Sequence, residues 1–339
     1  MRQAVLEQPG RLVLGDAPPP APPRPGEALV RVRRVGVCGT DFHAFKGDQP
    51  FFAYPRILGH ELGVELIETP SEAGVLKAGD RCALEPYMEC GRCVACRRGR
   101  TNCCAKLEVL GVHVDGGMKE LLTVPLRKLH RSESLSFEQL ALVETLSIGA
   151  HAVGRAGLEA GETVLVVGTG PIGLAVIQSA LPLGVQVLVT DVNEARLEFC
   201  RRQMGVESGF PADASAEEAL RGATRGEMPT VVFEATGNPA SMERSFGFVA
   251  SGGKLVLVGL CPAKIAFSDP EFHRREMTLL SSRNATAADF DRVVSAVEAG
   301  ALDTRPWVTH RASLSDVCQA LPAWARPDSG VLKAMVEIG

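Results

Sequence analysis

The sequence predicts an α/β protein of two domains, in which a β-rich domain is followed by a doubly wound parallel sheet. Its 339 residues exceed what one ordinary hydrophobic core holds. Short strand patterns separated by glycine and proline run from residue 12 to residue 124. From residue 163 onward, apolar strands alternate with helices, which is the pattern of βαβ units.

The first part contains short strand patterns separated by turn residues. They lie at residues 12–14, 28–35, 63–67, 80–84 and 121–124. Strands of this kind indicate a barrel or a sandwich with Greek-key connections. A proline-rich run at 17–25 separates the first two, and we expect it to form a stiff surface loop.

The second part begins after two helical patterns, at 138–143 and 148–153. The apolar run 163–167 has the composition of a buried parallel strand. Further strands are predicted at 186–190, 230–234 and 254–258, and helices at 172–183, 194–204, 217–221 and 241–249. A helix at 290–299 and a last strand at 331–338 are expected to return to the first domain. We therefore expect domains at 1–147 and 148–286, with 287–339 rejoining the first.

Composition and charge exclude several classes of function. Hydrophobic residues make up 45% and charged residues 22%, with a net charge of −4. Neither nucleic acid nor an anionic membrane is therefore an expected partner. The sequence has no apolar run long enough to span a membrane, and no apolar signal core at its start. We expect a cytoplasmic protein, in which clustered cysteines indicate metal rather than disulfides.

A glycine motif follows the first strand of the second domain. In Gly168-Thr169-Gly170-Pro171-Ile172-Gly173 the first glycine makes a tight turn and the second lets the backbone approach a pyrophosphate. The third lets helix and sheet pack closely. Asp191 ends the next strand, where a carboxylate can take both ribose hydroxyls and repels a 2′-phosphate. This favours NAD over NADP, and Arg196 partly offsets the repulsion. Further cofactor contacts are expected at Thr236, Val258 and Arg283.

Four cysteines lie in one short segment, at Cys90, Cys93, Cys96 and Cys104. Their spacing suits one tetrahedral zinc held by four thiolates. Four protein ligands close the coordination shell, so this zinc would be structural. Cys103 neighbours Cys104, and the spacing alone leaves either of them as the fourth ligand.

A second candidate metal site combines Cys38 with His60, both of them ligand types that zinc prefers. A catalytic zinc takes about three protein ligands and leaves one position open. Two carboxylates compete for the third place, Glu61 beside His60 and Glu144 further along the chain.

Thr40 and His43 lie close to Cys38 in the sequence and could carry a proton. Hydride transfer from an alcohol to a dinucleotide requires the hydroxyl to lose its proton. A zinc Lewis acid favours that loss. The sequence therefore predicts a zinc-dependent oxidoreductase.

Together these motifs resemble the zinc-containing medium-chain dehydrogenase/reductase family, in the polyol branch with sorbitol, threonine and sugar-acid dehydrogenases. The matching segments are 36–43, 59–61, the cysteine lobe at about 88–106, 143–147 and 168–173. The resemblance implies a GroES-like catalytic domain and a Rossmann NAD-binding domain, with the active site between them. It also implies one catalytic and one structural zinc, with Cys104 as the fourth ligand of the lobe.

The resemblance assigns roles around the catalytic zinc. Thr40 and His43 match the proton relay, and Asp41 matches the residue that orients His60. Glu144 stands where other alcohol dehydrogenases carry a cysteine, which places the chain with the carboxylate-ligand branch. Members of that branch differ in whether this glutamate binds zinc directly or through water, so Glu61 and Glu144 both remain candidates.

Segments 47–57, 111–118 and 281–286 resemble dehydrogenases of L-gulonate and L-galactonate, and a related group assigned to starvation sensing. Arg283 could hold a substrate carboxylate bidentately or contact the cofactor. Asn284 and His113 could bind substrate hydroxyls. Because His113 lies in a glycine-rich loop, a surface position explains it better than a ligand role does. His151, on a predicted helix, is better explained as a histidine packed in the core. We expect a homodimer or homotetramer, with strand 254–258 and its neighbours pairing across a twofold axis.

Other functions fit the sequence less well. A threonine, polyol or simple alcohol dehydrogenase of the same family is the first alternative. A zinc-free reductase of this fold would lack the cysteine lobe and the pair formed by Cys38 and His60. A non-catalytic regulator that senses NAD would not need every catalytic position to be kept.

Overall fold

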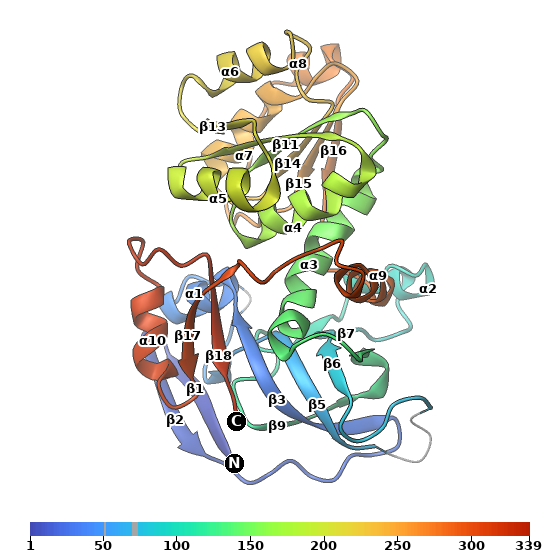
Figure 1. Ribbon diagram of the computed structural model, residues 1–339, viewed down its shortest axis with the longest axis vertical. Helices are drawn as coiled ribbons and strands as arrows, with labels where there is room; N and C mark the ends of the chain where they lie inside the picture. The colour runs from blue at the N-terminus through green and yellow to red at the C-terminus, as the bar shows by residue number, and fades with distance from the viewer. Residues whose placement is uncertain (51, 70–73) are drawn as a thin grey trace. The chain divides into compact units, whose positions relative to one another are not determined.

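The computed structural model describes residues 1–50, 52–69 and 74–339 (Figure 1). They form two compact units, one made of Met1–Glu144 with Thr286–Gly339 and the other of Thr145–Ala285. Phe51, part of the segment at 47–57, lies outside the described residues. The first unit is therefore assembled from both ends of the chain, and the second is one continuous stretch.

The first unit is built mainly from strands. They are β1 Arg2–Gln8, β2 Arg11–Asp16, β3 Glu27–Val37, β4 Arg56–Ile57, β5 Glu61–Glu68, β6 Arg81–Leu84, β7 Tyr87–Met88, β8 Glu108–Val109, β9 Leu121–Pro125, β10 Leu129–Ser132, β17 Val308–Ser313 and β18 Lys333–Glu337. The largest sheet has the order β10-β6-β5-β3-β18-β17, and β9 also pairs with β3. The predicted strands are confirmed, and alternate residues such as Val30 and Val32 fill the core.

The helices of the first unit are α1 Gly39–Lys46, α2 Val94–Arg97, α9 Ala287–Glu298 and α10 Val317–Trp324. Helix α3 Phe137–Ala156 begins in this unit and continues into the second. The two segments predicted to be helical, 138–143 and 148–153, are both helical, and the structure joins them into one helix. The polar residues between them are buried within the helix, with Glu144 at 6% exposure and Thr145 at 0%. No proline interrupts the helical hydrogen bonds there.

The second unit contains a six-stranded parallel sheet flanked by helices (Figure 1). Its elements are β11 Thr163–Val167, α4 Pro171–Ala180, β12 Gln186–Asp191, α5 Glu194–Met204, β13 Gly209–Pro211, α6 Ala216–Ala223, β14 Val231–Glu234, α7 Pro239–Ser245, β15 Lys254–Leu257, α8 Asp269–Arg274 and β16 Thr278–Ser281. The order β13-β12-β11-β14-β15-β16 is that of the Rossmann fold. Ligands of such sheets bind at the carboxyl ends of the strands where the order reverses, here beside β11 and β14.

Strand β18 joins the C-terminal segment to the sheet of the first unit, beside β3 (Figure 1). Ala334 of β18 pairs with Val37 of β3, and Glu61 of β5 pairs with Gly36 on the other edge of β3. Both neighbours are antiparallel to β3, so each begins where β3 ends. The first residue of β18, Lys333, is thereby brought to the same end of the sheet as Glu61. Across the described ranges, no helix is both long and apolar enough to cross a membrane.

Candidate active site and cofactor turn

Three candidate metal ligands meet at the end of β3. Cys38 follows β3 and caps the N-terminus of α1, whereas His60 and Glu61 lie at the start of β5. Because β3 and β5 are antiparallel neighbours, residues far apart in the sequence become adjacent. One ligand atom from each of the three side chains lies within 4.8 Å of the other two. His60 is 6% exposed and Glu61 is 1% exposed, whereas Cys38 is half-buried, so the group is buried on the side of β5.

Asp41 connects the two segments that carry these ligands. Its Oδ2 accepts a hydrogen bond from the Cys38 amide at 2.8 Å, and its Oδ1 accepts one from the Gly59 amide at 3.4 Å. The same Oδ1 lies 3.8 Å from Nδ1 of His60, within ion-pair range. Burial opposes a charged imidazole, but Asp41 and Cys38 outweigh it and raise the pKa of His60 well above its usual value.

The two candidate carboxylates have different partners. Oε1 of Glu61 accepts a hydrogen bond from Nζ of Lys333 at 2.5 Å. Oε1 of Glu144, on α3, accepts one from the hydroxyl of Tyr87. The group within 4.8 Å includes Glu61, and Glu144 is not a member of it. Glu144 still lies near enough to influence the charge of His60.

The donor set fits a cation. Burial raises the pKa of Asp41 and of Glu144, and the negative charge of Glu61 raises both further. Among the described residues, Nδ1 of His60 and Oε2 of Glu61 are buried and have no hydrogen-bond partner. Such atoms are costly unless something satisfies them. One thiol, one imidazole and one carboxylate are a donor set that suits zinc.

Thr40 and His43 both lie on α1, directly after Cys38. Sγ of Cys38 is 3.8 Å from Oγ1 of Thr40. Nδ1 of His43 is 2.8 Å from Oδ1 of Asp48, and the His43 side chain is 60% exposed. The hydroxyl therefore lies at the candidate metal group and the imidazole at the solvent, the two ends that a proton path requires.

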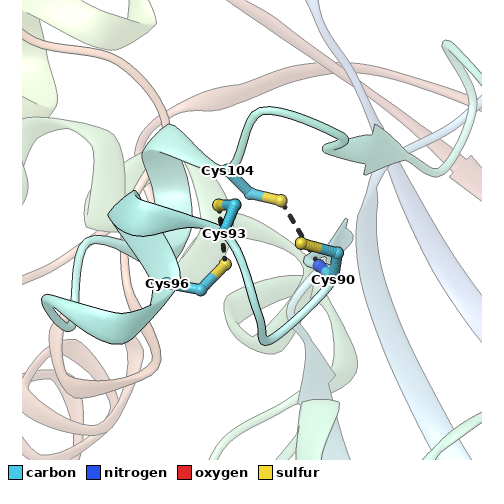
Figure 2. Close-up of side chains that lie close together, drawn as sticks. All are labelled: Cys90, Cys93, Cys96 and Cys104. Atoms are coloured by element: carbon cyan, nitrogen blue, oxygen red, sulfur yellow. Dashed lines mark hydrogen bonds between the residues drawn. The ribbon is translucent and has the colours of Figure 1, made fainter.

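The four cysteines of the lobe converge around α2 (Figure 2). Their sulfur atoms lie within 4.8 Å of one another, and the structure brings Cys104 rather than Cys103 to the group. Backbone hydrogen bonds from Cys96 and Ala105 lower the pKa of Cys93 to about 6. Burial and the neighbouring Cys93 raise that of Cys96 to about 12. Four thiolates gathered this closely repel one another, and a bound zinc ion would offset that repulsion.

The glycine motif follows β11 and opens α4. Gly168 has φ +89°, which favours glycine, and a Cβ at Gly173 would lie 1.9 Å from the Gly168 carbonyl oxygen. Pro171 and Ile172 form the first turn of α4. A Cβ at Gly170 would meet only Nη1 of Arg196, at 3.6 Å. The backbone at Gly170 is thus open to a ligand and has a cation beside it.

Asp191 ends β12 and is 5% exposed. Its oxygens accept hydrogen bonds from the amide and hydroxyl of Thr169, at 2.6 and 2.9 Å, and from the amide of Asn193 at 2.8 Å. The sequence suggested ribose hydroxyls as its partners, and the structure adds donors of the protein itself. A carboxylate has about four acceptor sites, so Asp191 can still accept a further hydrogen bond.

Three side chains with clear roles were missed by sequence reasoning: Tyr87, Lys333 and Glu234. Buried Glu234, at the end of β14, accepts hydrogen bonds from the hydroxyls of Thr236 and Ser241. It thereby fixes the turn whose Thr236 methyl group would meet a Cβ at Gly168. A charged residue inside an apolar strand pattern was the available signal for Glu234 and for Lys333.

The remaining predicted residues lie at strand ends or in loops. Val258 follows β15 and its amide donates to the Glu234 carbonyl at 2.8 Å. Exposed Arg283 follows β16, beside Asn284 with φ +51°. His113 is exposed in its loop, as expected of a surface residue. His151 is buried on α3, as expected of a packed histidine.

Comparison with known proteins places these sites in a family. Residues 24–134 match the family model of the alcohol dehydrogenase GroES-like domain, and residues 171–299 match that of zinc-binding dehydrogenase. An L-galactonate-5-dehydrogenase of Escherichia coli K12 is 41% identical over 311 residues, which are 92% of this chain and 91% of the relative.

Solved structures show the same fold. A structure from Escherichia coli CFT073, described as an alcohol dehydrogenase complexed with NADH, has a TM-score of 0.92 and 27% identity over 99% of both chains. A structure from Sinorhizobium meliloti 1021, described as a zinc-binding dehydrogenase bound to NADP, has a TM-score of 0.89 and 27% identity. It covers 99% of this chain and 98% of its own. The resemblance is confirmed: the chain belongs to the zinc-type alcohol dehydrogenase family, within its polyol and sugar-acid dehydrogenases.

Proposed function

We propose that the protein is an NAD-dependent zinc dehydrogenase that oxidises a secondary hydroxyl of a sugar acid such as L-galactonate or L-gulonate. The observation that carries the proposal is that ligand atoms of Cys38, His60 and Glu61 lie within 4.8 Å of one another. The 41% identity to an L-galactonate-5-dehydrogenase supports the substrate class.

Two zinc ions are proposed. Cys38 and His60, with Glu61 or Glu144, would hold the catalytic ion, and the four cysteines of the lobe would hold the structural one. The catalytic ion would act as a Lewis acid that lowers the pKa of the substrate hydroxyl. Thr40 would accept the hydroxyl proton and His43 would pass it to solvent, because Thr40 lies beside Cys38 and the His43 side chain is exposed.

NAD is the proposed cofactor. The open backbone at Gly170 and the N-terminus of α4 would receive the pyrophosphate, with Arg196 beside it. Asp191 would take a ribose hydroxyl and repel a 2′-phosphate. Thr236, Val258 and Arg283 all follow strands of the parallel sheet, at the end where such sheets bind dinucleotides.

The sugar-acid substrate supplies a carboxylate that needs a cation. Arg283 is exposed just after β16 and has the planar donor fork that holds a carboxylate bidentately. If Arg283 contacts the cofactor instead, Arg283→Lys would raise KM for NAD rather than KM for the sugar acid.

We infer a homodimer or homotetramer that forms through β16. The sequence proposed strand 254–258 with its neighbours: that strand corresponds to β15, which is paired on both sides, and its neighbour β16 lies at the edge of the sheet. In the part of the chain that the structure describes, β16 pairs only with β15, and Thr278, Leu279 and Ser281 are exposed. An open edge of this kind can pair with a second copy across a twofold axis. Sedimentation of Leu279→Lys should then show smaller species than wild type.

The test is a panel of polyols, sugar acids, threonine and simple alcohols with NAD or NADP, followed by the absorbance of the reduced nicotinamide. We expect the highest kcat/KM for a sugar acid with NAD. Cys38→Ser should abolish turnover and leave NADH binding intact, whereas Cys103→Ser, at an exposed thiol, should match wild type. Full turnover by Cys38→Ser would refute the zinc mechanism. NADH binding without turnover on any substrate would favour a regulator.

A further inference from the structure

Lys333 reaches Glu61 across an intervening strand. The sheet order is β18-β3-β5, so Lys333 and Glu61 belong to strands on opposite sides of β3. Their charged atoms are nevertheless 2.5 Å apart, and each side chain is only 1% exposed. Nζ of Lys333 also donates to the Val37 carbonyl at 3.3 Å. The contact passes over β3 at its last residues, directly before Cys38.

Gly36 leaves the space that this contact needs. A Cβ at Gly36 would lie 2.0 Å from Oε2 of Glu61 and 3.0 Å from its Cβ. Any side chain at position 36 would therefore displace the Glu61 carboxylate. The backbone of β3 at Gly36 and the ammonium of Lys333 together hold Glu61 in one orientation. A buried lysine is costly unless it is paired, so the carboxylate and the ammonium fix each other.

Glu144 is held by a different kind of group. Tyr87 is 2% exposed, and its hydroxyl donates to Oε1 of Glu144. The Tyr87 ring packs edge-on against Phe290 of α9, with centroids 6.1 Å apart. The packing against Phe290 therefore fixes the position of the Tyr87 hydroxyl. The direct partner of Glu144 is a neutral donor, whereas the direct partner of Glu61 is a cation.

We propose that Lys333 and Tyr87 are positioning residues that give the two carboxylates separate tasks. Lys333, aided by Gly36, presents Glu61 to the metal that Cys38 and His60 hold. Tyr87 keeps Glu144 outside the direct ligand set, as a nearby negative charge. This inference rests on the proposed catalytic zinc, and it makes the last strand of the chain a part of the metal centre.

Two consequences separate positioning from mere packing. Without Lys333 the freed Glu61 can turn and bind the metal through both oxygens, so the coordination changes although all ligands remain. Without the Tyr87 hydroxyl, Glu144 can move to the metal and add a ligand. Both changes alter the ligand field of a metal ion, and loss of packing alone would not.

The experiment replaces the catalytic zinc with Co²⁺ and records the visible spectrum of the full-length protein, together with zinc affinity by chelator competition. The variants are Lys333→Met, Lys333→Arg and Tyr87→Phe. Lys254→Met is the matched control, because Lys254 is also a strand lysine whose Nζ donates to a backbone carbonyl, that of Ala156 at 2.7 Å. Changes around a metal ligand typically alter affinity by about tenfold or more.

We expect Lys333→Met and Tyr87→Phe to shift the Co²⁺ bands and to change zinc affinity by about tenfold, while Lys254→Met keeps both. Lys333→Arg keeps the charge and should recover most of the wild-type spectrum. A folded Lys333→Met with wild-type spectrum and affinity would overturn the role of Lys333, and the same result for Tyr87→Phe would overturn that of Tyr87.

Two further results, a variant that does not fold and the absence of a zinc site, can be distinguished from failure of the positioning role. If Lys333→Met does not fold, Gly36→Ala tests the same contact, since it must displace Glu61. An unchanged Co²⁺ spectrum in Gly36→Ala would overturn the inference. If wild type and Cys38→Ser hold the same amount of metal, the proposed zinc site itself is wrong. Wild-type activity with an unchanged Lys333→Met spectrum would refute the positioning role alone.

Discussion

Cys103 and Cys104 are neighbours in the chain with opposite surroundings. Cys104 is 4% exposed and belongs to the four-sulfur group, whereas Cys103 is exposed and lies outside it. Cys104→Ser should lose about one zinc per chain and lower the Tm, because three thiolates no longer close the shell. Cys103→Ser should keep both values. Metal analysis by plasma emission, with a thermal scan, checks this, and equal zinc loss in both variants would contradict the assignment.

Gly173, in the first turn of α4, packs directly against the glycine turn that follows β11. Because a Cβ there would lie 1.9 Å from the Gly168 carbonyl oxygen, Gly173→Ala must push helix and turn apart. We expect a loss of about 1–3 kcal/mol and weaker NADH binding. Gly222→Ala in α6 is the control, since nothing lies within 4 Å of its Cβ position. That variant should be neutral or gain up to about 1 kcal/mol. Thermal unfolding and NADH fluorescence measure both.

A buried lysine just before β10, Lys128, pairs with two glutamates that precede the cysteine lobe in the chain, Glu85 and Glu89. Nζ of Lys128 lies 2.5 Å from oxygens of both Glu85 and Glu89, and its side chain is 4% exposed. Lys128→Met should cost about 3–5 kcal/mol, because two carboxylates lose their cation away from water. Arg127→Met removes an ion pair to Glu89 that is 54% exposed on the arginine side and should cost about 1 kcal/mol or less. Urea unfolding compares the two variants. Similar losses of unfolding free energy would show that the buried ion pairs of Lys128 contribute no more than the exposed pair of Arg127.

The first turn of α3 is tied to β17 by Glu138 and Arg311, through contacts of 2.7 and 3.0 Å. Hydrogen bonds from Arg311 lower the pKa of Glu138. The pair therefore stabilises the fold above the unfolded-state pKa of about 4.3, and the gain is lost as the pH falls through the lower folded-state value. Because both side chains are partly exposed, Glu138→Gln should cost only about 0.5–1 kcal/mol at pH 7. The deficit should shrink in urea titrations as the pH falls below the unfolded-state pKa of about 4.3 and through the lower folded-state value. A deficit independent of pH would argue against it.

Local patterns predicted the strands and most helices because each depends on neighbours in the chain. The bounds of α5 and the buried run of β11 follow directly from periodicity and from the glycine that ends α5. The sequence did not show that the helical patterns at 138–143 and 148–153 belong to one helix, because the polar residues between them face a buried environment that only the tertiary fold supplies. Sequence patterns do not report which polar positions the fold will enclose.

The candidate site shows the same limit over longer distances. Ligand type, the dinucleotide motif and the family resemblance together selected Cys38 and His60, and the structure brings them together with Glu61. The partners of the two carboxylates, Lys333 and Tyr87, were not predicted. Lys333 meets Glu61 only because β18 and β5 flank β3, and such sheet order is not encoded in any local pattern.

The division of the chain into two units predicts which parts of it should fold when expressed separately. All six strands of the parallel sheet lie within Thr145–Ala285, so this stretch has its own core. Residues 145–285 expressed alone should unfold cooperatively and bind NADH. The first unit differs, because β17 and β18 come from the C-terminal segment. In a chain ending at residue 285, β9 still pairs with the start of β3, but residues 34–37 of β3 lose their partner strand and buried Glu61 loses its cation.

Limited proteolysis of that shortened chain tests the consequence. Proteases should remove the N-terminal part and leave a resistant fragment that begins near residue 145. The full-length protein should resist along both units. Uniform resistance of the shortened chain would mean that the first unit folds without β18. In that case the C-terminal strand would not be required to build the sheet that carries Cys38 and His60.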